Sequence, residues 1–421
     1  MTHSPEHDAP ADSQVGSRTA RGVTATFLAA LALQNAIGPF ATDMYTPAFP
    51  QVTQDLATTS ALIGLTITTF FIGFGSGQVI GGGVSDQVGR RWPILAGGTV
   101  AVLGSLVCAI APNIWVLLAG RFLQGFGGGA AAAVGRAILT DVARGNTLAR
   151  TMSLLQAIGG LAPMLAPVLG ALIIEHFPWR VVFWTLAGGS ALMVVSAWMW
   201  TWESLPAEQR GQRGGLVEFV SGLGHVLRER TFVSLMFTSA FSFFCLFAYI
   251  SNSSYVFQET LGLSARAYSF IFAGNALLST LGALVNIRLV GRFQPRTLIL
   301  AGLTVSMAAV VLLVVSVFAL GTPLIAVAVG FALLMAAQSF VFGNAAALAL
   351  GSVREWAGTA SAIQGLVQAL AAAVSSPLAT AGGADPAPMT WVMVAGICLA
   401  CVAFAFLPRQ SSPSGSRLPT D

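Results

Sequence analysis

The chain has 421 residues, of which 55% are hydrophobic and only 9% are charged, and its formal net charge is +4 at pH 7. Soluble globular proteins carry about 25% charged residues, so this composition predicts a polytopic membrane protein. All 20 basic residues are arginine. Without lysine, the chain has neither the phosphate-binding lysine of a Walker A loop nor a Schiff-base lysine. The positive charge is expected to reflect loop topology, so we expect no nucleic-acid partner.

Cysteine and histidine positions predict no metal site and no cofactor. The histidines, at positions 3, 7, 176 and 225, fall in predicted tails or loops. Cys398 and Cys401 have C-x-x-C spacing, but they lie in an apolar segment without a nearby histidine, so we expect small packing residues. Because no histidines, cysteines or paired carboxylates cluster in the apolar segments, we do not expect an enzyme.

The apolar segments predict the fold class. A membrane-spanning helix needs roughly 20 apolar residues, and twelve segments qualify, at about 23–46, 58–82, 93–111, 114–138, 150–174, 179–201, 232–256, 267–289, 296–319, 323–349, 357–381 and 388–408. We therefore expect an all-α polytopic membrane protein with twelve transmembrane helices in two pseudo-symmetric six-helix bundles. The expected parts are a disordered tail at 1–20, a first bundle at 21–202, a central loop at 203–231, a second bundle at 232–408 and a tail at 409–421.

Arginine placement predicts the orientation. Seventeen arginines fall in the tails and in the loops that alternate onto one side, whereas only Arg180 and Arg266 fall in the opposite loops. Positive charge concentrates on the cytoplasmic side of membrane proteins, so both termini are expected in the cytoplasm. The remaining arginine, Arg121, lies inside the fourth segment.

The first motif follows the second segment and reads Gly82-Gly-Val-Ser-Asp86-Gln-Val-Gly89-Arg90-Arg91. We place it in a short loop, where Gly82 allows close backbone approach and Gly89 allows a tight turn. Gly282-x-x-x-Asn286 is a faint repeat of its beginning in the second half.

This pattern resembles the signature of the major facilitator superfamily. The resemblance implies a gate in which Asp86 caps the helix that starts near 358–360, and Arg90 pairs with Asp141 after the fourth helix. These contacts would hold an outward-facing state.

The second motif, Arg121-Phe-Leu-Gln124-Gly125, lies in the fourth segment and resembles the family's R-x-x-Q-G motif. A guanidinium inside a bilayer is costly unless it faces a partner or a water-filled space. The resemblance implies a polar group beside a proton site. The alternative is a structural arginine that donates to backbone carbonyls. Glycines 125 and 127–129 are expected to be close-packing positions.

The third motif, in the fifth segment, places Pro163 and Pro167 inside a helix and is followed by Gly170. It resembles the antiporter motif of drug exporters, with alanine at positions 162, 166 and 171 in place of glycine. The alternative is a helix kinked by its prolines.

The fourth motif, Thr42-Asp43-Met44-Tyr45, carries a carboxylate near the end of the first segment. With the stretch 248–258, it is similar to the Bcr/CflA branch, which holds bicyclomycin, chloramphenicol and florfenicol exporters. Asp43 lies about 30 Å along a helix that begins near Val23, and this length alone favours a capping position at the outer interface. Ionisable groups within membrane proteins are candidate functional sites, so Asp43, with Arg121, is the predicted proton-coupling site.

Polar side chains in the segments are candidates for substrate contact. The alternative for each is a hydrogen bond between helices. The candidates are Asn35, Tyr45, Gln124, Gln156, Tyr249, Asn252, Asn275, Gln338 and Asn344.

These patterns together predict a monomeric transporter in a bacterial inner membrane. We expect proton-coupled efflux of small amphipathic drugs, with phenicols such as chloramphenicol as candidates, by alternating access. The alternative is an exporter or facilitator of one endogenous metabolite. The expected partners are the lipid bilayer, the substrate and protons.

Overall fold

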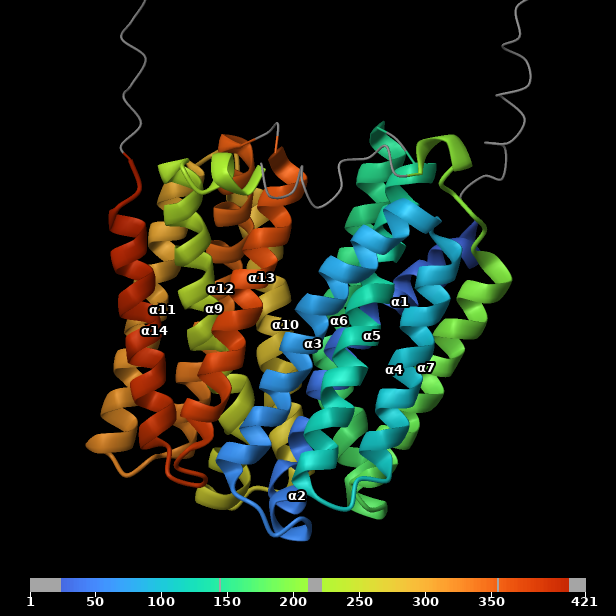
Figure 1. The fold of residues 1–421 in the computed structure, drawn as a ribbon. Coiled ribbons are helices and arrows are strands. Elements are labelled where there is room, and N and C mark those ends of the chain that lie inside the picture. Colours follow the sequence, from blue (N-terminus) through green and yellow to red (C-terminus); the bar gives the residue numbers. More distant parts are fainter. Residues whose placement is uncertain (1–23, 144, 211–221, 354–355, 409–421) are drawn as a thin grey trace, which may run out of the picture.

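A computed structural model describes residues 24–143, 145–210, 222–353 and 356–408, with the side chains of 144–150 and 152–161 outside that description. Within these ranges the chain is almost entirely helical (Figure 1). The long helices are α1 (Ala25–Asp43), α3 (Ser60–Val88), α4 (Arg91–Ala109), α5 (Ile114–Val142), α6 (Gly145–His176), α7 (Arg180–Trp200), α9 (Arg230–Tyr255), α10 (Ala265–Leu289), α11 (Pro295–Phe318), α12 (Leu324–Ser352), α13 (Ala357–Thr380) and α14 (Ala387–Ala405). The short ones are η2 (Thr46–Ala48), α2 (Phe49–Asp55), η3 (Ala207–Gln209) and the π-helical η4 (Val256–Thr260).

Nine helices in the described ranges are long and apolar enough to cross a membrane. They are α3, α4, α7, α9 with η4, and α10 to α14. The helices α1, α5 and α6 fall outside this set, although they lie where the first, fourth and fifth spanning segments are predicted.

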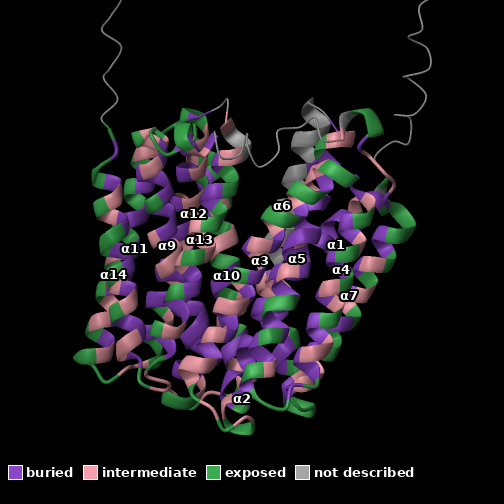
Figure 2. Ribbon diagram, in the orientation of Figure 1, coloured by how far each residue is buried: buried purple, intermediate pink, exposed green. Residues whose placement is uncertain are grey.

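The helices pack as two bundles, which we call the N-terminal bundle (α1 to α7) and the C-terminal bundle (α9 to α14) (Figure 1). The bundles meet beside α2 and diverge toward the end at which α1 begins and α14 ends. We call these the α2 end and the terminal end. Contact between the bundles runs mainly through α3 with α13 and α6 with α10. Figure 2 shows buried residues inside each bundle and around α2.

Glycines bring α3 and α5 into close contact. A Cβ added at Gly125 or Gly129 of α5 would collide with the backbone of Phe70 or Phe74, and one at Gly73 or Gly77 of α3 would collide with α5. Small residues permit such close approach between membrane helices. This tight pair forms the centre of the N-terminal bundle and fixes where Arg121 of α5 enters it.

Two helix boundaries differ from the predicted ones. The first helix ends at Asp43 rather than near residue 46, because Pro47 has no N–H to donate to the Asp43 carbonyl; the Thr46 hydroxyl donates to it instead, at 2.9 Å. The second spanning helix continues to Val88 rather than ending near 82, so most of the first motif is helical. Gly89, with φ +102°, and Arg90 form the turn between α3 and α4.

Candidate functional site

Asp43 is the last residue of α1 and is buried, with 6% of its surface exposed. The Thr42 hydroxyl donates to its carboxylate Oδ1 at 3.1 Å. Within the described residues it makes no ion pair, and none joins it to Arg121. A buried carboxylate without a cationic partner is costly as an anion, which makes Asp43 a candidate functional group.

The C-terminal bundle places two tyrosines within electrostatic range of Asp43. Asp43 interacts electrostatically with the hydroxyl groups of Tyr249 on α9 and Tyr268 on α10, and both rings are fully buried. Asn275 donates to the Tyr249 hydroxyl at 2.9 Å, and the Tyr268 hydroxyl lies 3.1 Å from that of Ser253. The carboxylate of one bundle therefore lies within electrostatic range of a polar cluster of the other.

Arg121 is fully buried in the N-terminal bundle and donates to carbonyl oxygens. Its Nη1 lies 2.8 Å from the Ala41 oxygen and 2.6 Å from Oε1 of Gln124, and its Nε lies 3.4 Å from the Thr66 oxygen. Its guanidinium carbon also lies 4.5 Å from the centre of the Phe70 ring. In this state Arg121 has the carbonyl contacts of the structural alternative, and it approaches the Asp43 region through the Ala41 carbonyl and the Tyr45 ring, whose centre lies 5.2 Å from its guanidinium carbon.

The other predicted substrate residues separate into distinct environments. Gln124 is bound on both sides, because it accepts from Arg121 and donates to the Ser105 hydroxyl at 2.9 Å. The Tyr45 ring packs against Phe183, with centroids 5.0 Å apart. Asn344 donates to Oδ1 of Asn286 at 2.7 Å, which joins α12 to the faint repeat on α10. These contacts are hydrogen bonds and packing within a bundle.

Two predicted substrate residues are buried amides whose polar atoms have no protein hydrogen-bond partner in the described part of the chain. They are Asn252 on α9 and Gln338 on α12, at 0% and 2% exposure. Unpartnered buried polar groups are costly, so these amides are positioned to bind a polar ligand or water. Asn35 is half-buried on α1, and the side chain of Gln156 lies outside the described residues.

The first motif forms a charged cluster at the terminal end. Arg90 is 2% exposed and binds two carboxylates, Asp86 at 2.6 Å and Asp141 at 3.0 Å. Arg91 donates to the Trp198 carbonyl at 3.2 Å. A Cβ added at Gly82 would meet nothing within 4 Å, so no backbone approaches Gly82 here. The predicted Arg90–Asp141 pair is thus present, while the ends of α3 and α13 at this side of the molecule lie apart (Figure 1).

Glu203 completes this cluster, and the sequence analysis did not select it. Its carboxylate accepts from the backbone N–H of Arg90 at 2.8 Å, of Arg91 at 3.3 Å and of Leu205 at 3.1 Å. Carboxylates are favourable at a helix start, where backbone N–H groups lack partners. Glu203 lies in the long polar stretch between the two halves, where nothing in the sequence distinguishes it from the other charged residues.

The prolines of the third motif lie inside α6, where Gly170 packs against α1. A Cβ at Gly170 would collide with the Met44 carbonyl, one residue from Asp43. Pro163 and Pro167 are both interior to the helix. The third motif therefore supports the end of α1 that carries the carboxylate.

Polar contacts join the bundles at the α2 end, close to Asp43. The Thr53 and Tyr255 hydroxyls lie 2.7 Å apart, and Gln258 donates to the Pro47 carbonyl at 3.1 Å. Arg266 of α10 forms an ion pair with Glu175 of α6 at 2.5 Å. Arg266 was an exception to the predicted arginine bias, but its partner could not be identified from sequence.

This arrangement of two helical bundles, which meet around buried polar residues, defines the class of membrane transporters. The family model described as Major Facilitator Superfamily matches residues 31–376. The chain therefore belongs to the major facilitator superfamily and is a multi-pass membrane transporter, not an enzyme. The predicted all-α polytopic fold is confirmed.

Curated relatives cover most of the chain. It is 32% identical over 377 residues to the uncharacterized MFS-type transporter YdgK of Bacillus subtilis (strain 168), which covers 89% of this chain and 93% of that protein. It is 31% identical over 373 residues to the multidrug resistance protein MdtL of Escherichia coli (strain SMS-3-5 / SECEC). That match covers 88% of this chain and 91% of MdtL.

Solved structures share the fold at low identity. A bacterial homolog of the human lysosomal transporter Spinster, in an inward-facing and unoccupied conformation, matches with a TM-score of 0.70 at 15% identity and covers 92% of this chain and 97% of that one. The D-xylose-proton symporter matches with a TM-score of 0.71 at 16% identity, and the match covers 91% of this chain and 98% of the symporter.

Proposed function

We propose that this transporter exports small amphipathic drugs in exchange for protons. The observation that carries the proposal is Asp43, a buried carboxylate without an ion-pair partner in the described residues, at the junction of the two bundles. The relationship to MdtL, a protein named for multidrug resistance, supports drug export. The resemblance of the stretch around Asp43 to the Bcr/CflA branch supports the same assignment.

The proposed mechanism is alternating access of the two bundles around Asp43. Asp43 takes up a proton from outside when the bundles part at the α2 end, and the neutral form is favoured as the site closes, because burial disfavours the anion. Release to the cytoplasm then accompanies drug binding in the state that is open at the terminal end, so protons move inward as drug moves outward. A proton gradient supplies about 1.4 kcal/mol per pH unit, and membrane potential adds about 2.3 kcal/mol per 100 mV if net charge moves. In this proposal Asp86, Arg90, Arg91 and Asp141 belong to the gate at the terminal end.

The terminal end is proposed to face the cytoplasm, from the arginine bias. The state described here, with its bundles in contact at the α2 end, is then inward-facing. The domain boundaries at 202–203 and 231–232 separate the two moving units in this proposal.

Neutral substrates fit the proposed site, because the polar groups near the junction are mainly amides and hydroxyls. Asn252, Asn275, Gln338 and Tyr249 are the candidate contacts that the C-terminal bundle offers. Phenicols such as chloramphenicol carry such neutral polar groups and are the first compounds to test. Export of one endogenous metabolite by the same mechanism is the second candidate, favoured by the two unpartnered amides, which suit a specific polar ligand.

The decisive experiment replaces Asp43 and measures drug–proton exchange in inverted membrane vesicles. Asp43→Asn keeps the shape but cannot carry a proton, so proton-dependent drug uptake into the vesicles should be abolished. The matched control is Asp55→Asn, which changes an exposed carboxylate bound by Trp179 and Arg180, and it should retain transport. Full activity of Asp43→Asn would refute proton coupling at this residue. A drug panel, with resistance measured with and without a protonophore, distinguishes drug from metabolite export.

A further inference from the structure

The seam between α3 and α13 joins the bundles through hydrogen bonds that recur about once per helical turn. In each, a hydroxyl of one bundle donates to a backbone carbonyl of the other, and we call these three contacts the rungs. They are Ser60 Oγ to the Thr380 oxygen at 2.7 Å, Ser376 Oγ to the Gly64 oxygen at 2.9 Å, and Thr68 Oγ1 to the Ala373 oxygen at 2.5 Å. The pairing order shows that the two helices run antiparallel.

One acceptor carbonyl is available because of a proline inside α13. Pro377 has no N–H, so the Ala373 carbonyl, four residues earlier, lacks its usual helical donor. The hydroxyl of Thr68 binds this carbonyl. The Thr380 carbonyl, at the end of α13, accepts from the Gly383 N–H at 3.0 Å as well as from the Ser60 hydroxyl. The Thr68 rung therefore uses an acceptor that Pro377 leaves without a helical donor.

Gly64 lets the two helices approach at the middle rung. A Cβ at this position would collide with the Thr380 hydroxyl and lie 3.0 Å from the Ser376 carbonyl and 3.1 Å from the Pro377 Cα. Ser376 and Thr380 are both fully buried. The contact is therefore close-packed as well as hydrogen-bonded.

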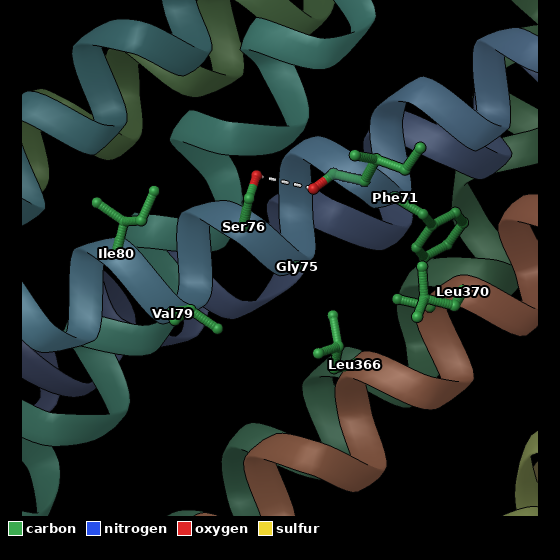
Figure 3. Close-up of a pocket in the computed structure, with 9 residues that line it drawn as sticks. Phe71, Gly75, Ser76, Val79, Ile80, Leu366 and Leu370 are labelled. Carbon is green, nitrogen blue, oxygen red and sulfur yellow. Dashed lines mark hydrogen bonds between the residues drawn. The ribbon is translucent and has the colours of Figure 1, made fainter. Parts of the chain in front are cut away.

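About one turn beyond the Thr68 rung, toward the terminal end, the hydrogen bonds that the described residues make between α3 and α13 stop. There α3 and α13 are separated by a pocket of about 320 Å³ (Figure 3). The hydroxyl of Ser76, a lining residue, is bonded to the Ile72 carbonyl of its own helix at 2.8 Å. The lining is otherwise apolar and consists of Phe71, Ile72, Gly75, Val79 and Ile80 of α3 with Leu366, Ala369 and Leu370 of α13.

We propose that this seam is a two-position contact that sets the balance between the two states of the transporter. The rungs hold the bundles together at the α2 end, and the pocket is the space that α13 fills when the bundles meet at the terminal end instead. The inference rests on the alternating access proposed above. It assigns the balance to named residues of α3 and α13, none of which belongs to the proposed proton site.

The test measures the distance between the terminal ends of α3 and α13 with spin labels. Cysteines replace the exposed residues Gln87 and Ser361 in a full-length protein whose four native cysteines are replaced. A long distance reports the state described here, and a short distance reports closure at the terminal end. The ratio of the two populations is measured in lipid without drug and without a pH gradient.

Ser375 and Ser376 provide a matched pair for the rungs. Both are fully buried neighbours on α13, and both donate to a carbonyl, but Ser376 donates across the seam to Gly64 whereas Ser375 donates to Phe244 within its own bundle. The net value of one hydrogen bond corresponds to an about two- to tenfold change in an equilibrium. Ser376→Ala should lower the long-to-short ratio by that factor, and Ser375→Ala should leave it unchanged.

Two wedges on the same seam should act in opposite directions. Gly64→Ala places a methyl group against Thr380 and Ser376, so it should favour the short distance. Ala369→Trp fills the pocket, so it should suppress the short distance. The opposite signs separate a shift in balance from general destabilisation, which would not depend on which end of the seam is filled.

Equal effects of Ser375→Ala and Ser376→Ala would overturn the proposal, as would an Ala369→Trp protein that still reaches the short distance. Because the ratio is measured without drug and without a pH gradient, it tests the seam independently of substrate and coupling. A failure of Asp43→Asn to abolish coupled transport would refute the proton site and leave these distance ratios as they are.

Discussion

Asp43 shows how a residue near a helix end becomes a buried one. Length along α1 favours an interfacial position, yet Asp43 is only 6% exposed, and two tyrosines of the C-terminal bundle lie within electrostatic range of its carboxylate. Pro47 ends α1 at this residue, and η2 follows directly, with the Thr46 hydroxyl donating to the Asp43 carbonyl. The proposed proton site therefore depends on contacts from segments on both sides of the central loop.

Arg121 illustrates a role that depends on geometry as well as charge. Its planar guanidinium reaches the Ala41 and Thr66 carbonyls, Gln124 and the face of Phe70 together. A lysine at this position keeps the charge but loses the planar fork. Arg121→Lys should lower the stability of the purified protein by about 1–3 kcal/mol, the value of one or two hydrogen bonds from a charged group, measured by thermal unfolding in detergent.

The control for this prediction is Arg91→Lys. Arg91 makes one described side-chain hydrogen bond, to the Trp198 carbonyl, which a lysine amine can also make. The free energy of unfolding of the Arg91→Lys variant should therefore change by less than about 0.5 kcal/mol, as expected for surface substitutions. Equal losses in the two variants would contradict the role of the guanidinium geometry.

At the scale of elements, the helix ends at the α2 end explain the two arginines that depart from the charge bias. Arg180 pairs with Asp55 inside the N-terminal bundle, whereas Arg266 pairs with Glu175 across the bundles. Hydrogen bonds from Trp179 and then Arg180 hold the pKa of the Asp55 carboxyl below its usual range. This carboxylate therefore stabilises the fold at neutral pH and loses that effect only as the pH falls through its lowered pKa.

These two ion pairs give a prediction about the contact between the bundles. Both are exposed, and exposed pairs are worth about 0–1 kcal/mol. Glu175→Gln should lower the proportion of the state described here by no more than about fivefold, measured as the distance between labels at positions 87 and 361. Asp55→Asn removes a pair within one bundle, so it should leave the proportion unchanged.

A double variant, Glu175→Arg with Arg266→Glu, should restore the proportion, because it reverses the pair without removing it. High salt should reduce the effect of Glu175→Gln, since exposed charges are screened. An effect of Asp55→Asn as large as that of Glu175→Gln would argue that the charge at this end, rather than the contact across the bundles, matters.

The first motif contains the end of α3, a boundary that the sequence placed too early and the structure sets at Val88. Its glycine was sufficient to predict the turn at Gly89, because glycine has a local conformational meaning, whereas the Arg90–Asp141 pair was implied by the resemblance to the superfamily signature. The continuation of α3 to Val88 follows from packing of that helix against α5. Glu203 joins the cluster from more than 100 residues away, so spacing could not reveal it.

At the scale of the whole molecule, the orientation in the membrane remains a prediction from the arginine bias. In a protein whose native cysteines are replaced, a cysteine at Gln54 lies at the α2 end and one at Gln87 lies at the terminal end, and both residues are exposed. In intact cells, an impermeant thiol reagent should label Gln54→Cys and not Gln87→Cys. Inverted vesicles are the control, and there the labelling should reverse. Labelling of Gln87→Cys from outside intact cells would reverse the proposed orientation.

The sequence by itself determined the class of protein, the approximate positions of the helices and the motifs of the superfamily. It could do so because hydrophobic length, charge bias and local glycine and proline chemistry act along the chain. Tertiary structure decided that Asp43 is buried without an ion-pair partner in the described residues, that Arg121 binds carbonyls instead of Asp43, and that Arg266 joins the bundles. It also placed the Thr68 hydroxyl of α3 against the Ala373 carbonyl, which Pro377 leaves without a helical donor. These features depend on pairs of residues up to about 320 positions apart, which only packing of the two bundles brings together.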